Sequence, residues 1–61
     1  MKRIKITYWS NWPIDAFGFR RFSGNKVLTT ESFLATDMQD AIRTFARWHD
    51  ISLIQSLILE E

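Results

Sequence analysis

The 61-residue sequence has no cysteine, one histidine, one proline and two glycines. Without cysteine, neither a disulfide nor a thiolate metal site can form. A single histidine and carboxylates in no recognised spacing do not supply the three or four ligands that a metal site needs. Gly18 and Gly24 stand alone, so no glycine-rich phosphate loop is present. We therefore expect no metal and no cofactor.

Candidate catalytic groups are equally scarce. A serine or threonine nucleophile needs a base within hydrogen-bond reach, and His49 is the only histidine. It falls at the end of a predicted helix, where histidine is more typical as a favourable C-terminal charge or a half-buried filler. Asp37 and Asp40 fall at the start of the same helix, where capping explains them. We expect a protein that is not an enzyme and has no catalytic residue.

Long apolar runs are also missing. No stretch reaches 18 consecutive apolar residues, and the basic start MKRIK is followed by ITYWS rather than by an apolar segment. The sequence therefore predicts neither a membrane span nor a signal peptide, and we expect a cytoplasmic protein.

The chain is short for a domain that folds without disulfides or metals. A chain of this size buries only about 60% of the surface that its unfolded form exposes. Its stability must come from apolar side chains, and 46% of the residues are hydrophobic and 15% aromatic. We expect one domain, residues 1–61, with oligomerisation as the other available aid.

Charge is distributed unevenly although the net charge is only +1. Residues 1–30 hold six basic residues and one acidic residue, whereas residues 31–61 hold two basic and six acidic ones. This asymmetry predicts either a basic face that meets an acidic partner or ordinary solvated charge on strands and helix.

Hydrophobic periodicity predicts a β-β-β-α-β order. Residues 4–9 alternate apolar and polar side chains in the manner of a half-buried strand. Further strands are predicted at 16–22 and 26–34, joined by a hairpin turn at Gly24 and Asn25. A helix is predicted at 37–49 and a last strand at 51–61. The sequence thus indicates an α+β fold, a small single-layer and mostly antiparallel sheet with one amphipathic helix packed on one face.

The helix has the clearest local signals. Thr36 and Gln39 have the spacing of a capping box, and Met38, Ala41, Ile42, Phe45 and either Trp48 or His49 recur at helical spacing. The last strand is apolar on both faces, which is typical of a central or covered strand. One helix covers only one side of a sheet, so the aromatic loop, another subunit or a partner must cover the other.

Six of the nine aromatic residues lie in YWSNWPIDAFGFRRF, residues 8–22. Strand alternation predicts that Phe17 and Phe19 join the core beneath the helix. Core packing explains three other aromatic residues less well, and with nearby basic residues they form a candidate partner-binding patch on the face opposite the helix: Lys5, Trp9, Trp12, Arg20, Arg21 and Phe22.

Three interpretations of this patch remain open. Its rings and cations suit a protein interface, where Trp and Arg are common anchors. They also suit single-stranded nucleic acid, whose bases stack on rings while cations hold the phosphates. The small net charge and the absence of an RNA- or DNA-binding signature count against nucleic acid. In the third interpretation, Trp9 and Trp12 fold back as a second small core.

The segment FLATDMQDAIRTFARWHDISLIQSLILEE, residues 33–61, resembles small bacteriophage-encoded inhibitors, namely small anti-CRISPR proteins and phage inhibitors of host RNA polymerase. Those proteins similarly pass from a strand through a cap into a short amphipathic helix and a final strand. The resemblance implies a stoichiometric inhibitor that occludes a site on a larger host protein or nucleoprotein machine. It covers about half of the chain, and no functional residue carries over from it.

The expected function is therefore a non-catalytic protein-binding module that acts as a phage-type inhibitor. The alternatives are a single-stranded nucleic-acid-binding protein and a homodimeric structural or adaptor protein.

Overall fold

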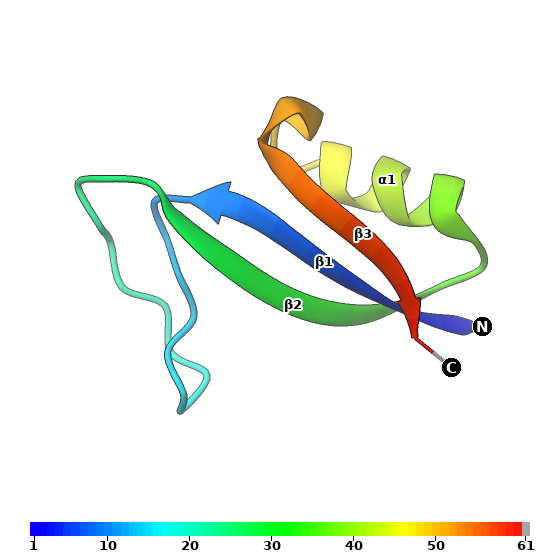
Figure 1. Ribbon diagram of the computed structural model, residues 1–61, viewed down its shortest axis with the longest axis horizontal. Helices are drawn as coiled ribbons and strands as arrows, with labels where there is room; N and C mark the ends of the chain where they lie inside the picture. Colours follow the sequence, from blue (N-terminus) through cyan, green and yellow to red (C-terminus); the bar gives the residue numbers. More distant parts are fainter. Residues whose placement is uncertain (61) are drawn as a thin grey trace.

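Three antiparallel strands form one sheet in the order β2-β1-β3. The computed structural model describes residues 1–60, with β1 at Lys2–Ser10, β2 at Val27–Ala35 and β3 at Ile54–Glu60. β1 pairs with both neighbours, so the first strand of the chain is the central one (Figure 1). The α+β class and the antiparallel sheet expected from the sequence are confirmed.

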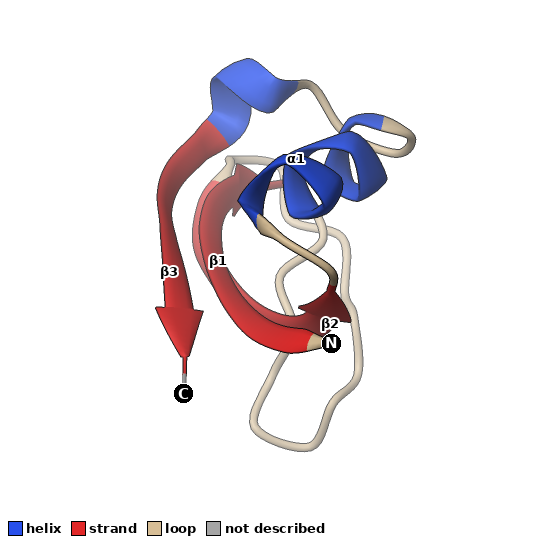
Figure 2. Ribbon diagram, turned by 90° about the vertical axis from the view of Figure 1, so that its right-hand side faces the viewer, coloured by secondary structure: helices blue, strands red, loops and turns tan. Residues whose placement is uncertain are grey.

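The core lies between the sheet and one helix, α1 (Met38–Ala46). Figure 2 shows α1 on one side of the sheet, and alternation along β1 buries every second side chain on that side from Ile4 to Ser10. The buried apolar side chains are Ile4, Ile6, Tyr8, Ala35, Ala41 and Phe45. Six residues are a small core even for this length, so most of the large apolar side chains remain partly or largely exposed.

The start of α1 differs from the predicted capping box by one residue. Asp37, in an extended conformation, is the N-cap, and its Oδ1 accepts a hydrogen bond of 2.8 Å from the backbone N–H of Asp40. Asp40 in turn accepts from the backbone N–H of Thr36 at 3.0 Å, and this bond lowers the pKa of the Asp40 carboxyl. Aspartate caps more strongly than threonine, which explains why the helix begins one residue later than the Thr36 spacing suggests.

The predicted strand 51–61 is shorter in the structure. Residues Ile51–Leu53 form a 3-10 helix, η1, because the Asp50 carboxylate accepts the backbone N–H of Ser52 and its carbonyl accepts that of Leu53. β3 then starts at Ile54 and has a bulge at Gln55, where the register with β1 shifts. Glu61 lies outside the described residues. β3 lies at an edge of the sheet rather than at its centre, and the bulge places Ile54 on the helix face with Leu57 and Leu59, which leaves Ile58 as the one apolar side chain of β3 on the outer face.

The predicted strand at 16–22 is wrong, and so is the predicted hairpin at Gly24 and Asn25. Residues 11–26 form one long loop that joins β1 to β2, with only an isolated bridge between Ile14 and Arg20 (Figure 1). Asp15 explains the difference, because its carboxylate accepts the backbone N–H groups of Phe17 and Phe19 at 2.9 and 3.0 Å. These local bonds bend the chain into a turn, as aspartate often does in competition with strand pairing.

Gly18 completes this turn with a φ of +84°, a conformation that other residues rarely adopt. Consequently Phe17 and Phe19 do not join the core as predicted but lie at the tip of the loop, 85% and 68% exposed. Among residues 1–60, no helix has the length and hydrophobicity required to cross a bilayer.

Candidate functional site

The loop of residues 11–26 is held at its base by its own hydrogen bonds. The backbone N–H of Ser23 donates to the carbonyl of Asn11 at 2.7 Å, and the Asn11 side chain donates back to the Ser23 carbonyl at 3.0 Å. The Ser10 hydroxyl accepts the backbone N–H of Trp12 at 2.9 Å. This narrow neck makes the segment a compact loop of the Ω type, which positions its side chains on the protein surface.

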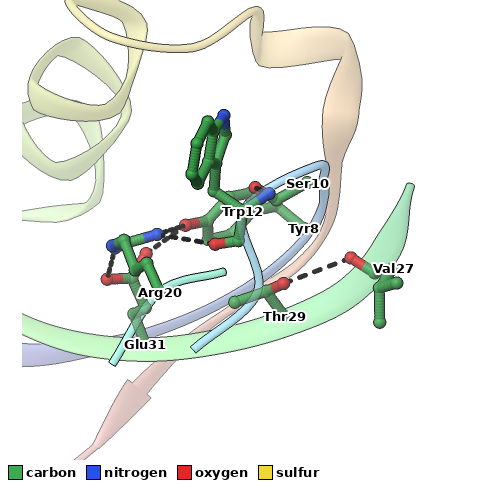
Figure 3. Close-up of polar contacts among 7 residues, drawn as sticks. All are labelled: Tyr8, Ser10, Trp12, Arg20, Val27, Thr29 and Glu31. Atoms are coloured by element: carbon green, nitrogen blue, oxygen red, sulfur yellow. Dashed lines mark hydrogen bonds and ion pairs between the residues drawn. The ribbon is translucent and has the colours of Figure 1, made fainter. Parts of the chain in front are cut away.

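Arg20 ties the loop to the sheet. Its guanidinium donates to Glu31 in the middle of β2 and to the carbonyl of Trp12 at 3.0 Å, with a longer contact to the Tyr8 hydroxyl (Figure 3). Tyr8 itself donates to the other carboxylate oxygen of Glu31. Glu31 lies opposite Ile6 in the register and therefore on the helix side of the sheet. The loop thus folds back over the helix side of β2.

These contacts shift two pKa values. Burial raises the pKa of Tyr8 above its ordinary value of 10.0, and the hydrogen bond to Glu31 acts in the same direction. The hydrogen bond with Tyr8 is the main cause that raises the pKa of Arg20, with further support from the Glu31 carboxylate. Arg20 is therefore a charged anchor whose charge is already balanced by Glu31 within the protein.

Two grooves adjoin this anchor. The first has a volume of about 350 Å³ and lies between α1 and β2, lined among others by Arg20, Glu31, Phe33 and Phe45. The second has a volume of about 310 Å³ and lies beside the neck of the loop. Trp48 and His49 line both grooves, so the two grooves adjoin each other. The residues that line the second groove include Trp9, Trp12, Phe22, Lys26, Trp48 and Leu53.

Aromatic side chains line these grooves and the loop beside them. Trp12 and Phe22 touch edge to face, with ring centroids 5.3 Å apart, and 52% and 65% of the two side chains are exposed. Trp48, just beyond the end of α1, is 81% exposed. We call this set the aromatic surface: Trp12, Phe17, Phe19, Arg20, Phe22 and Trp48.

The structure brings together only part of the predicted patch. Trp9 is 42% exposed near the end of β1 and borders the second groove with Trp12 and Phe22. Arg20 contributes to the first groove, which adjoins the second. The predicted location is wrong for Trp12 and Arg20, because the loop that carries them folds over the helix side of the sheet, whereas Trp9 alternates with the buried Tyr8 and its side chain leaves β1 on the other face. The bond of Arg20 to Glu31 is the reason that the loop folds onto the helix side.

Lys5 and Arg21 are not part of this arrangement. Lys5 lies in the middle of β1 between the buried side chains of Ile4 and Ile6, so its own side chain faces away from α1. Arg21 is exposed and lines neither groove.

Sequence reasoning missed Trp48 as a surface residue. The helical spacing allowed either Trp48 or His49 to complete the apolar stripe of the helix. In the structure His49 turns inward and stacks on Phe45 with ring centroids 4.7 Å apart, so it is the half-buried filler that its position suggested. Trp48 is then left in solvent. Glu31 was also missed, because only the loop reveals it as the partner of Arg20.

Comparison with known proteins adds no identity to this geometry. No family model, curated protein or solved structure matches this chain. Within residues 1–60, no group of three or more acidic or histidine side chains is placed to hold a metal ion.

Proposed function

We propose that this chain is a cytoplasmic, non-catalytic protein-binding module that holds its partner on the aromatic surface. The observation that carries the proposal is the exposure of five large rings on one loop and the adjoining helix end. At least half of each of these side chains is exposed, in Trp12, Phe17, Phe19, Phe22 and Trp48. Trp12, Phe22 and Trp48 adjoin the second groove, and exposed apolar patches of this kind mark interaction sites in soluble proteins.

The composition of the surface favours a protein partner. Tryptophan and arginine are the residues most enriched among the anchors that dominate protein interfaces, with phenylalanine also common there. The grooves beside Trp12, Phe22 and Trp48 are hollows into which apolar partner side chains can fit. The bonds at the neck and of Arg20 hold the loop in place before binding, which reduces the entropy lost on association.

Charge distribution weakens the case for nucleic acid. Phosphate contacts supply much of the affinity for nucleic acid, yet Arg20 already pairs with Glu31, an acidic group beside the rings. Lys5 faces the other side of the sheet. A protein interface, in which aromatic anchors contribute most, is the better explanation of a surface with balanced charge.

The proposed mode of action is occlusion. The resemblance of residues 33–61 to phage inhibitors supports the view that the partner is a larger host protein or nucleoprotein machine, whose working site this small domain would cover. Such an inhibitor needs affinity and shape rather than reactive groups, and the aromatic surface supplies both.

The test is affinity capture from bacterial lysate, with and without nuclease, followed by titration of the purified captured protein. The bait is the wild type, a Trp12→Ala, Phe22→Ala double variant, or a Leu34→Ala control. Leu34 is 60% exposed and lies away from the aromatic surface on the other side of the sheet. Circular dichroism must show that all three baits are folded.

We expect the wild type and Leu34→Ala to bind one identified protein alike, in both lysates. The double variant should bind it at least about 30-fold more weakly, since an anchor residue contributes about 2 kcal/mol or more. Capture that disappears with nuclease would instead indicate nucleic acid. Binding that is lost in Leu34→Ala but kept in the double variant would contradict the proposed surface.

A further inference from the structure

The outer edge of β3 has no neighbour in the sheet that the structure describes. Backbone N–H and C=O groups on that edge point away from β1 and are free to pair with another strand. The helix face of the strand is apolar, and the other face carries Ile58 between Ser56 and Glu60. Leu57 and Leu59 face the helix layer, where they pack against the core but remain only half-buried, and Ile58 is 51% exposed on the other face. A further strand beside β3 would cover these three partly exposed apolar side chains.

β3 also lacks most of the features by which proteins protect an edge. It contains no lysine, arginine or proline, and its only charged residue, Glu60, is at its end. The bulge at Gln55 disturbs the beginning of the strand. From Ser56 to Glu60 the pairing with β1 is continuous, which leaves a straight and unprotected edge of five residues.

This straight segment is complementary to itself. In an antiparallel pair of two such segments centred on Ile58, Leu57 of each copy lies opposite Leu59 of the other. The two Ile58 side chains face each other, and each Ser56 faces Glu60. No like charges are opposed, and all apolar side chains on the two faces meet apolar partners, which is what fixes the register of a strand pair.

The opposite edge of the sheet does not have this property. β2 (Val27–Ala35) is centred on Glu31, so two copies paired centre to centre would oppose two carboxylates. The chain's net charge of +1 adds little general repulsion between copies.

We propose that the partner of β3 is a second copy of this chain, which pairs antiparallel along Ser56–Glu60 and joins two sheets into one of six strands. The twofold axis would run through the sheet at Ile58, perpendicular to it, and both helices would lie on the same side. The order of strands would be β2-β1-β3-β3-β1-β2. Two aromatic surfaces would then face one side of the assembly and could engage two sites at once, which raises apparent affinity. This inference is independent of the partner-binding proposal.

Sedimentation equilibrium over a range of protein concentrations tests the dimer, with Ile58→Lys as the disrupting variant. This substitution replaces the central apolar contact of the dimer by two opposed cations. Because residue 58 is half-exposed in the monomer, the variant monomer should still fold, and circular dichroism checks this. We expect self-association to weaken at least tenfold, about 1.4 kcal/mol. Leu34→Lys is the matched control, because Leu34 is similarly exposed on the same face but lies on β2. It should change the dissociation constant less than threefold.

Amide hydrogen exchange of the wild type is the second measurement and needs no variant. Amides of Ser56–Glu60 that are not bonded to β1 should exchange more slowly as protein concentration rises. A wild type that sediments as a monomer, with no such protection at the highest concentration used, would overturn the proposal. So would a dimer that Leu34→Lys disrupts and Ile58→Lys does not, because that result indicates face-to-face packing of the sheets.

Discussion

Phe45 and Phe19 are chemically identical side chains for which the structure predicts opposite effects on stability. Phe45 is 6% exposed, lies edge to face with Tyr8 at 5.0 Å and stacks on His49. Replacing such a buried ring by alanine removes about 3–5 kcal/mol. A domain of this length has a total free energy of unfolding of about 3–9 kcal/mol, at about 0.05–0.15 kcal/mol per residue. We therefore expect Phe45→Ala to lose at least about a third of the free energy of unfolding.

Phe19→Ala, in contrast, should change the free energy of unfolding by no more than about 0.5 kcal/mol, because its ring is already in solvent. The assay is urea unfolding followed by tryptophan fluorescence and far-ultraviolet circular dichroism. Phe45→Leu, which keeps an apolar side chain but loses the ring contacts, should fall between the two and provide a measurable midpoint. A loss of about 2 kcal/mol or more in Phe19→Ala would refute the placement of the loop, and a loss below about 1 kcal/mol in Phe45→Ala would refute the described core.

Three further predictions concern single groups. Tyr8 is the only tyrosine, so ultraviolet absorbance reports its ionisation directly. Because its pKa is raised in the folded protein, the phenol contributes stability that is complete below pH 10.0 and is lost as the pH rises through the native pKa. Glu31→Gln should lower the pKa of Tyr8, and an unchanged pKa would contradict the hydrogen bond between the two residues. Gly18→Ala should lower the free energy of unfolding by about 1 kcal/mol, because Gly18 has a positive φ. Gly24 has open space around it and no positive φ, so Gly24→Ala should leave the free energy of unfolding unchanged or raise it slightly in the same urea assay. Asp37→Ala removes the helix cap and should lower the free energy of unfolding by about 1 kcal/mol. This loss corresponds to a decrease of about 4–8 °C in the thermal midpoint, and an unchanged midpoint would contradict the cap assignment.

Local patterns predicted the regular elements because each carries its own signal along the chain. Alternation in residues 4–8 identified β1 and its inward side chains, Ile4, Ile6 and Tyr8, all of which are buried. Helical spacing identified α1. The prediction failed in residues 16–22, where alternating aromatic residues looked like a strand. There the Asp15 carboxylate offers the backbone hydrogen bonds that a neighbouring strand would otherwise supply.

The predicted patch and the aromatic surface share three residues, Trp12, Arg20 and Phe22. Trp9, Trp12 and Phe22 were predicted to be the aromatic residues that core packing explains least, because that judgement needs only their spacing, and Arg20 was added as a nearby basic residue. Their arrangement depends on Glu31, eleven residues from Arg20 in the chain, and no local pattern links the two. The part that Trp48 plays depended on whether it or His49 turned inward, a choice made by contact with Phe45 and Tyr8.

The sequence by itself determined an α+β domain with a capped helix, because alternation, helical spacing and capping act between residues that are near each other in the chain. Tertiary structure decided which strand lies at the centre, where the loop folds and which rings remain in solvent. Those outcomes depend on contacts between distant residues, such as Arg20 with Glu31 and β1 with both of its neighbours. The placement of β3 at an edge, although its sequence pattern is typical of a central or covered strand, is the clearest case, since strand order is a property of the assembled sheet.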